Sequence, residues 1–186
     1  MRNITLFILL LTLTVSAQAQ RRLHGQQGLQ LTVGKVDGLK GNTIHTGIAL
    51  SQFTKNGHQW KFGAEYLRKK LQYGKQIIPL EQFTGEAGYC RTVLSDARKN
   101  FFFTGGISGV AGYELLNRSE TLLDDGSTLL SESKFLFGGA FSLEIETYIT
   151  DSFILLTGFR QRILPGSTVN KFHYQWSVGL KFIINN

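Results

Sequence analysis

The sequence contains one cysteine, two prolines and no apolar run long enough to cross a bilayer as a helix. The single cysteine, Cys90, cannot form an internal disulfide, and we expect a small side chain packed in a wall. The residues in excess are glycine, with 21 copies, and aromatics, with 14 Phe, 6 Tyr and 2 Trp. Glycine and aromatics with almost no proline suit long, closely packed strands better than helices. Composition therefore predicts an all-β protein.

The first 19 residues have the pattern of an export signal. A positive start, Met1-Arg2-Asn3, precedes an apolar run from Ile4 to Val15 and the small-x-small triplet Ala17-Gln18-Ala19. The run is about a dozen residues, whereas a membrane-spanning helix needs roughly 20. We expect a cleaved signal peptide at 1–19 and a single β-barrel domain at 20–186. Losing Arg2 lowers the formal net charge by one, from +7 to +6.

Eight segments alternate large apolar residues with small or polar ones, which predicts two-faced strands. They cover residues 28–34, 43–53, 58–67, 77–91, 101–114, 134–147, 153–162 and 172–186. Turn residues separate them, among them Asn56-Gly57, a strong hairpin signal. No helical segment intervenes, so we expect an eight-stranded antiparallel up-and-down barrel, closed by pairing of the last segment with residues 29–33. Inside the longest connection, "TLLDDGSTLL" predicts a small hairpin turning at Asp125-Gly126.

The volume of the apolar face separates a membrane barrel from a soluble one. An eight-stranded barrel has an interior only just wide enough for side chains. The aromatic face is too bulky to fit inside, and we expect it to face lipid. The residues predicted to face lipid are Trp60, Phe62, Tyr66, Phe141, Phe159, Trp176, Leu180 and Phe182. The pattern is therefore that of an outer-membrane barrel, whose short turns lie in the periplasm.

The opposite face carries glycine, alanine, serine, threonine and several charges. One Lys or Arg facing lipid at mid-bilayer costs about 2–4 kcal/mol, which favours an inward position for these charges. We expect a structural polar network in the lumen, formed by Lys61, Glu65, Glu86, Glu144, Glu146, Arg160 and Lys181.

The sequence offers no catalytic, cofactor or metal site. The four histidines are isolated and lack metal-ligand spacing. Gly106-Ile107-Ser108-Gly109 lacks the final glycine of a nucleophile elbow, because Val110 stands there. The basic clusters, including Arg68-Lys69-Lys70, are dispersed, so we expect no sequence-specific nucleic-acid binding. In the predicted topology that cluster meets the anionic outer surface.

Four stretches resemble the conjugative-transposon TraO family. They are "GIALSQFTKNGHQWKFGAEYLRK", "IPLEQFTGEAGYC", "FLFGGAFSLEIETYITDSFILL" and "KFHYQWSVGLKFIIN", and the resemblance extends from about Gly28 to Asn185. It implies an exported, non-catalytic component of the DNA-transfer apparatus of conjugative transposons, at the outer membrane of a Gram-negative bacterium, near a type IV secretion channel. The implied partners are outer-membrane lipid and other proteins of that apparatus.

Two other functions stay open at the level of the sequence. One is a barrel enzyme that modifies envelope lipids, with a serine near His45 or His173 at one rim. The other is a soluble periplasmic β-protein that binds the transfer machinery. A DNA pore is disfavoured, since side chains fill the lumen of an eight-stranded barrel.

Overall fold

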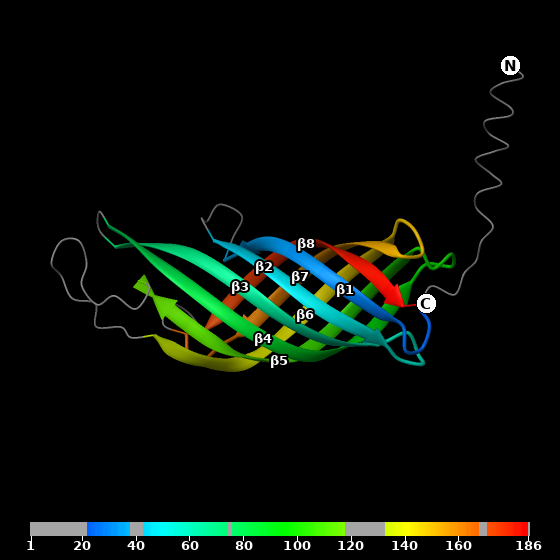
Figure 1. Cartoon of the computed structure of the whole chain (residues 1–186), viewed down its shortest axis with the longest axis horizontal. Coiled ribbons are helices and arrows are strands. Elements are labelled where there is room, and N and C mark those ends of the chain that lie inside the picture. The colour runs from blue at the N-terminus through cyan, green and yellow to red at the C-terminus, as the bar shows by residue number, and fades with distance from the viewer. Residues whose placement is uncertain (1–21, 38–42, 74–75, 118–132, 168–170, 186) are drawn as a thin grey trace, which may run out of the picture.

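The computed structural model describes residues 22–37, 43–73, 76–117, 133–167 and 171–185. These residues form eight strands in one closed antiparallel barrel, in which each strand pairs with its neighbours in the sequence (Figure 1). The strands are β1 (Gln27–Val36), β2 (Ile44–Phe53), β3 (Gln59–Tyr73), β4 (Gln76–Ser95), β5 (Phe101–Leu116), β6 (Lys134–Tyr148), β7 (Phe153–Ile163) and β8 (Phe172–Asn185). The predicted eight-stranded fold is confirmed.

The first and last strands close the barrel. Leu29 of β1 pairs with Phe182 of β8, and Val33 pairs with Val178. The predicted partner of the closing strand is therefore correct. Closure leaves neither strand with an unpaired edge, which removes the aggregation hazard of an apolar edge strand.

The two ends of the barrel differ. At the turn end, residues 54–58, 96–100 and 149–152 make short connections, and both β1 begins and β8 ends there. At the loop end, β3 and β4 continue as a hairpin beyond the last β2 partner, where Ile44 meets Arg68. The signal peptide predicted at 1–19 and the hairpin predicted at Asp125-Gly126 lie outside the described residues.

Strands β3 and β4 are longer than the sequence pattern indicates. The expected segments were 58–67 and 77–91, whereas the strands reach Tyr73 and Ser95. The alternation fades after Leu67 because Arg68-Lys69-Lys70 interrupts it. Pro79 lies just beyond Leu80, the last residue that β4 pairs with β5, at a position where a residue without an N–H is tolerated.

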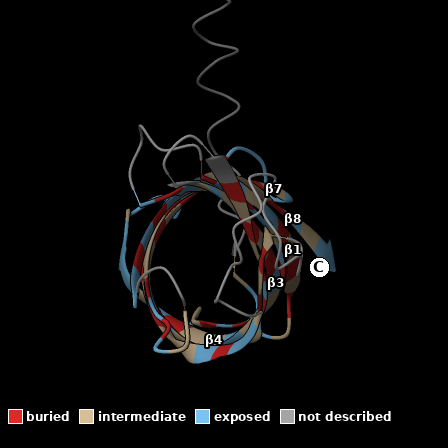
Figure 2. Ribbon diagram, turned by 90° about the vertical axis from the view of Figure 1, so that its left-hand side faces the viewer, coloured by how far each residue is buried: buried red, intermediate tan, exposed pale blue. Residues whose placement is uncertain are grey.

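The alternation of side chains produces an outer apolar face and a buried inner face. Figure 2, a view along the barrel, shows buried and exposed residues succeeding one another along the strands. Buried polar and charged side chains line the inner face along the barrel, and apolar clusters lie among them toward both ends. Phe102, Tyr148, Ile154 and Leu156 pack together at the turn end, and Val36, Leu67, Ile78, Leu80 and Leu116 pack at the loop end. The sequence predicted an inner lining of small residues and charges, and the structure adds these larger apolar side chains toward both ends.

Candidate functional site

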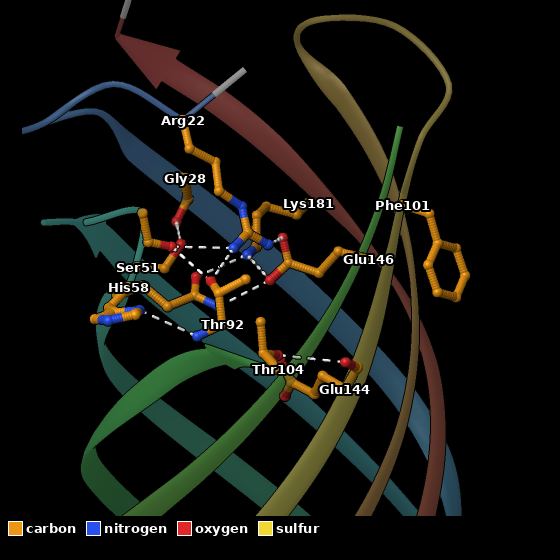
Figure 3. A network of polar contacts seen from close by, with 12 residues as sticks. Arg22, Gly28, Ser51, His58, Thr92, Phe101, Thr104, Glu144, Glu146 and Lys181 are labelled. Carbon is orange, nitrogen blue, oxygen red and sulfur yellow. Dashed lines mark hydrogen bonds and ion pairs between the residues drawn. The ribbon is translucent and has the colours of Figure 1, made fainter. Parts of the chain in front are cut away.

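The inner face at the turn end is organised around the Glu146 carboxylate (Figure 3). Its Oε1 accepts hydrogen bonds from Lys181 Nζ at 2.7 Å and Gln59 Nε2 at 2.8 Å. Its Oε2 accepts one from Arg22 Nη2 at 2.8 Å. Lys181 and Glu146 are both fully buried. A buried carboxylate with several charge-assisted hydrogen bonds fixes the strands that carry its partners, here β3, β6 and β8.

Arg22 enters the barrel from the segment that precedes β1. Its guanidinium donates to Thr92 Oγ1 at 2.6 Å and to the Gly57 carbonyl at 3.0 Å, and it lies 3.7 Å from the centre of the Phe102 ring. The side chain is 4% exposed. Arg22 therefore contacts a carboxylate, two neutral oxygen acceptors and an aromatic ring, and its side chain closes the lumen at the turn end.

A second set of ion pairs crosses the lumen at mid-height. Lys61 of β3 pairs with Glu144 of β6. Arg160 of β7 donates to Glu86 Oε1 of β4 at 2.9 Å and to Glu65 Oε2 of β3 at 3.0 Å. Because these strands lie on different sides of the ring, the pairs tie opposite walls together.

Glu65 is the acidic centre of this second set. Its Oε1 accepts from Arg162 Nη1 at 2.7 Å and from Gln175 Nε2 at 2.6 Å. His45 Nδ1 lies 3.5 Å from Oε2. Arg162 also donates to Thr84 Oγ1 at 2.8 Å. The carboxylate thus faces two guanidiniums, an imidazole and an amide inside a closed wall.

The structure places all seven residues of the predicted polar network on the inner face. It joins them by ion pairs in three groups: Glu146 with Lys181, Lys61 with Glu144, and Arg160 with Glu65 and Glu86. Neither Arg22 nor the buried glutamines were assigned to the lumen from the sequence. Gln59 and Gln175 carried a usable signal, since both fall on the inward register of their strands.

The loop end has a polar latch made of Asp37, Lys69 and His173. Asp37 Oδ2 lies 2.8 Å from Lys69 Nζ and 3.2 Å from His173 Nδ1. Asp37 has a φ of 55°, in the left-handed region, and its backbone N–H donates to the Tyr174 carbonyl at 2.8 Å. Partial burial works to raise the pKa of Asp37, but hydrogen bonds and charges of Lys69 and His173 outweigh it and lower that pKa.

The outer face carries the residues predicted to face lipid. Five of the eight are exposed, namely Trp60, Phe62, Phe141, Trp176 and Phe182. Tyr66, Phe159 and Leu180 are half-buried. The half-buried aromatics pack on neighbours of the same face, with ring centres 4.9 Å apart for Tyr66–Phe83 and 4.8 Å for Phe159–Trp176. All eight side chains point away from the lumen, as their register requires.

The match that identifies the family of the chain covers nearly its whole length. Residues 23–184 match the family described as TraO, conjugative transposon protein TraO. The chain belongs to the TraO family. The resemblance seen in the four quoted stretches is thereby confirmed. A search among curated proteins finds no match to this TraO-family chain.

Solved structures share the fold of this TraO-family chain. Ail, the attachment invasion locus protein of Yersinia pestis, superposes with a TM-score of 0.59 at 11% identity, covering 87% of this chain and 100% of that one. Neisserial surface protein A gives 0.56 at 16% identity, covering 85% and 96%. OprG from Pseudomonas aeruginosa, an outer membrane protein, gives 0.54 at 9% identity, covering 89% and 99%. At these identities the likeness establishes an outer-membrane type of barrel.

The histidines considered for an enzymatic site are engaged with carboxylates. His45 lies against Glu65 and the Trp176 carbonyl, and His173 lies against Asp37; both are buried. In the described part of the chain, no three His, Cys, Asp or Glu side chains are grouped as a metal ion requires. Over the same residues, no helix is long and apolar enough to cross a membrane. Cys90 is buried.

Proposed function

We propose that this TraO-family protein is a structural or accessory component of a conjugative-transposon transfer apparatus, seated in the outer membrane of a Gram-negative bacterium. The observation that carries the proposal is the family match over residues 23–184, on a barrel of outer-membrane type. The outward aromatic face supports a lipid environment, because such an area exposed to water would favour association. The partners we propose are outer-membrane lipid and other proteins of the apparatus.

A structural role fits the interior better than a conduit for DNA. Ion pairs join β3 to β6 and β7 across the lumen, and apolar clusters fill both of its ends. A strand of DNA passing through would have to break buried pairs whose separation leaves uncompensated charges. The proposal therefore assigns the protein to assembly or support of the apparatus, with no catalysis of its own.

Deletion of the gene within a conjugative transposon tests the role. We expect transfer frequency to fall sharply while growth of the donor is unaffected, and a copy supplied in trans to restore transfer. The matched control is a copy with Glu81→Ala, which removes an ion pair of 3.8 Å whose Arg68 side chain is 48% exposed. Unchanged transfer in the deletion strain would contradict the role.

Fractionation of the cell tests the location. We expect the protein in the outer-membrane fraction, with a gel mobility that differs between unheated and boiled samples, as a closed barrel resists unfolding in detergent. Export of a copy lacking residues 1–19 should fail. Recovery of the native protein in the soluble periplasm would favour the soluble β-protein and contradict the proposed location.

A further inference from the structure

A shallow apolar groove crosses the outer face of β2, β3 and β4. Its volume is about 540 Å³, and its outward-facing lining consists of Thr46, Ile48, Ala64, Tyr66, Phe83 and Gly85. The residues form two adjacent register rows, Thr46–Tyr66–Phe83 and Ile48–Ala64–Gly85. The second row is hollow because alanine and glycine stand where the first row carries the rings of Tyr66 and Phe83. The Tyr66 and Phe83 rings, in contact at a tilt of 41°, form the wall toward the loop end.

Positive charge begins immediately above this groove. Arg68 follows Tyr66 on the same face of β3, two residues or about 7 Å nearer the loop end. Lys35, two strands away in the same register row, and Lys70, next along β3, also face outward and are exposed. Lys69 points to the other face and pairs with Asp37.

Glu81 is the acid beside Arg68. Its Oε1 lies 3.8 Å from Arg68 Nε, a distance beyond a hydrogen bond, and the Arg68 side chain is 48% exposed. Lys35, Arg68 and Lys70 together with Glu81 leave a net charge of +2 on this part of the rim. An anion placed over Arg68 and Lys70 is therefore attracted, and a guanidinium can offer it two parallel donors.

An apolar groove that runs into a cationic rim matches one kind of molecule, an amphiphile with an anionic head. We propose that this face binds a phosphorylated lipid of the outer leaflet, of the lipid A class, with a phosphate on Arg68 and Lys70 and an acyl chain over Ala64 and Gly85. The inference rests on the proposed outer-membrane location. An apolar protein segment in the groove would leave Arg68 and Lys70 without an anionic partner of its own.

Native mass spectrometry of the detergent-purified protein tests the site. The probe is bisphosphorylated lipid A, compared with the same lipid after removal of both phosphates. We expect one lipid A bound per chain, with binding weakened about tenfold in Arg68→Gln/Lys70→Gln, as for loss of a charge-assisted hydrogen bond. Ala64→Leu should fill the groove and weaken binding as well. Arg91→Gln, an exposed cation near the turn end of β4, is the matched control and should bind normally.

Heat-dependent gel mobility establishes that each variant is folded before binding is measured. Equal binding of dephosphorylated lipid A, or equal binding by all variants, would overturn the proposal. A co-purified protein that is lost in Ala64→Leu, without lipid A binding, would also overturn it in favour of a protein partner. The binding result can be told apart from a failure of the proposed function. Recovery of the protein in the soluble periplasm would contradict the proposed location. An outer-membrane protein that binds no lipid A would contradict only the lipid site.

Discussion

The Glu146 carboxylate accepts hydrogen bonds from Lys181, Gln59 and Arg22 inside a wall that excludes water. A buried ion pair is weak evidence for stability as a whole, but removing one partner leaves the other charge uncompensated. At the residue scale, losing Glu146 should therefore destabilise the fold more than losing a carboxylate at the rim.

Glu146→Ala should lower the free energy of unfolding by about 3–5 kcal/mol, because Lys181 and Arg22 then lose their buried anion. Urea unfolding in detergent micelles, followed by the gel shift of the folded form, measures the change. Glu81→Ala is the control, since its ion pair with the half-exposed Arg68 should contribute about 0–1 kcal/mol. Adding Lys181→Met to Glu146→Ala should recover part of the loss; equal effects of the Glu146 and Glu81 variants would contradict this reading.

Arg22 acts at the residue scale in a different way, because it holds a segment that lies outside the strands. Its donors reach Thr92, the Gly57 carbonyl and Glu146, so the residues around it are tied to the turn end. Arg22→Ala should leave the barrel closed but expose the residues before β1 to a protease, measured as cleavage ahead of Gln27 in the folded protein. Arg22→Lys keeps the charge but loses the planar fork, and should give an intermediate rate. A cleavage rate unchanged in Arg22→Ala would show that other contacts hold this segment.

At the scale of the element, the Asp37 latch connects the end of β1 with β3 and β8 through Lys69 and His173. The pKa of Asp37 lies below its usual value, since the hydrogen bonds and charges of its partners outweigh partial burial. A group with a lowered folded-state pKa stabilises the fold at any pH above its unfolded-state pKa, about 3.9 for Asp. That stabilisation is lost as pH falls through the folded-state value.

The pH dependence of Asp37→Asn follows from this sign. The difference in the free energy of unfolding between the protein and the variant should shrink as pH falls below about 4, because Asp37 is then protonated in the folded state. Urea midpoints measured from pH 7 to pH 3 give the comparison. Asp151→Asn, an exposed change at the turn end, controls for the general effect of acid on the barrel. A difference that grows as pH falls from about 4 to 3 would contradict the latch.

The strands themselves were largely predictable, because alternation and turn residues are local signals. Asn56-Gly57 marks the β2–β3 turn, where Gly57 has a φ of 69°. The pairing inside the lumen was not predictable, because which acid meets which base depends on the stagger of strands far apart in the sequence. Lys61 meets Glu144 from 83 residues away. Arg22 had no periodic pattern around it, and the β3–β4 extension lies where charged residues break the alternation.

At the scale of the whole molecule, the barrel reverses the usual arrangement of a soluble protein. Buried ion pairs such as Lys181–Glu146 lie inside it, and large apolar side chains such as Ile107, 70% exposed, cover the outside. An apolar outer surface of this kind is unfavourable in water and favourable in lipid. A charge on it should matter little in water, whereas in a bilayer the cost depends on depth.

Two arginine substitutions on the outer face distinguish these environments. Ile107 lies midway along the apolar face, where it pairs with Tyr89 and Phe141, and Val93, 56% exposed, lies near the turn end of β4. In lipid vesicles, Ile107→Arg should lower the free energy of unfolding by about 2–4 kcal/mol and Val93→Arg by about 0–1 kcal/mol. Urea unfolding in vesicles, monitored by gel shift, measures both. For a barrel surrounded by water, each change should stay within about 0.5 kcal/mol. Equal, small effects at the two positions would therefore contradict a membrane setting, because only a bilayer makes the cost of a charge depend on its depth along the barrel.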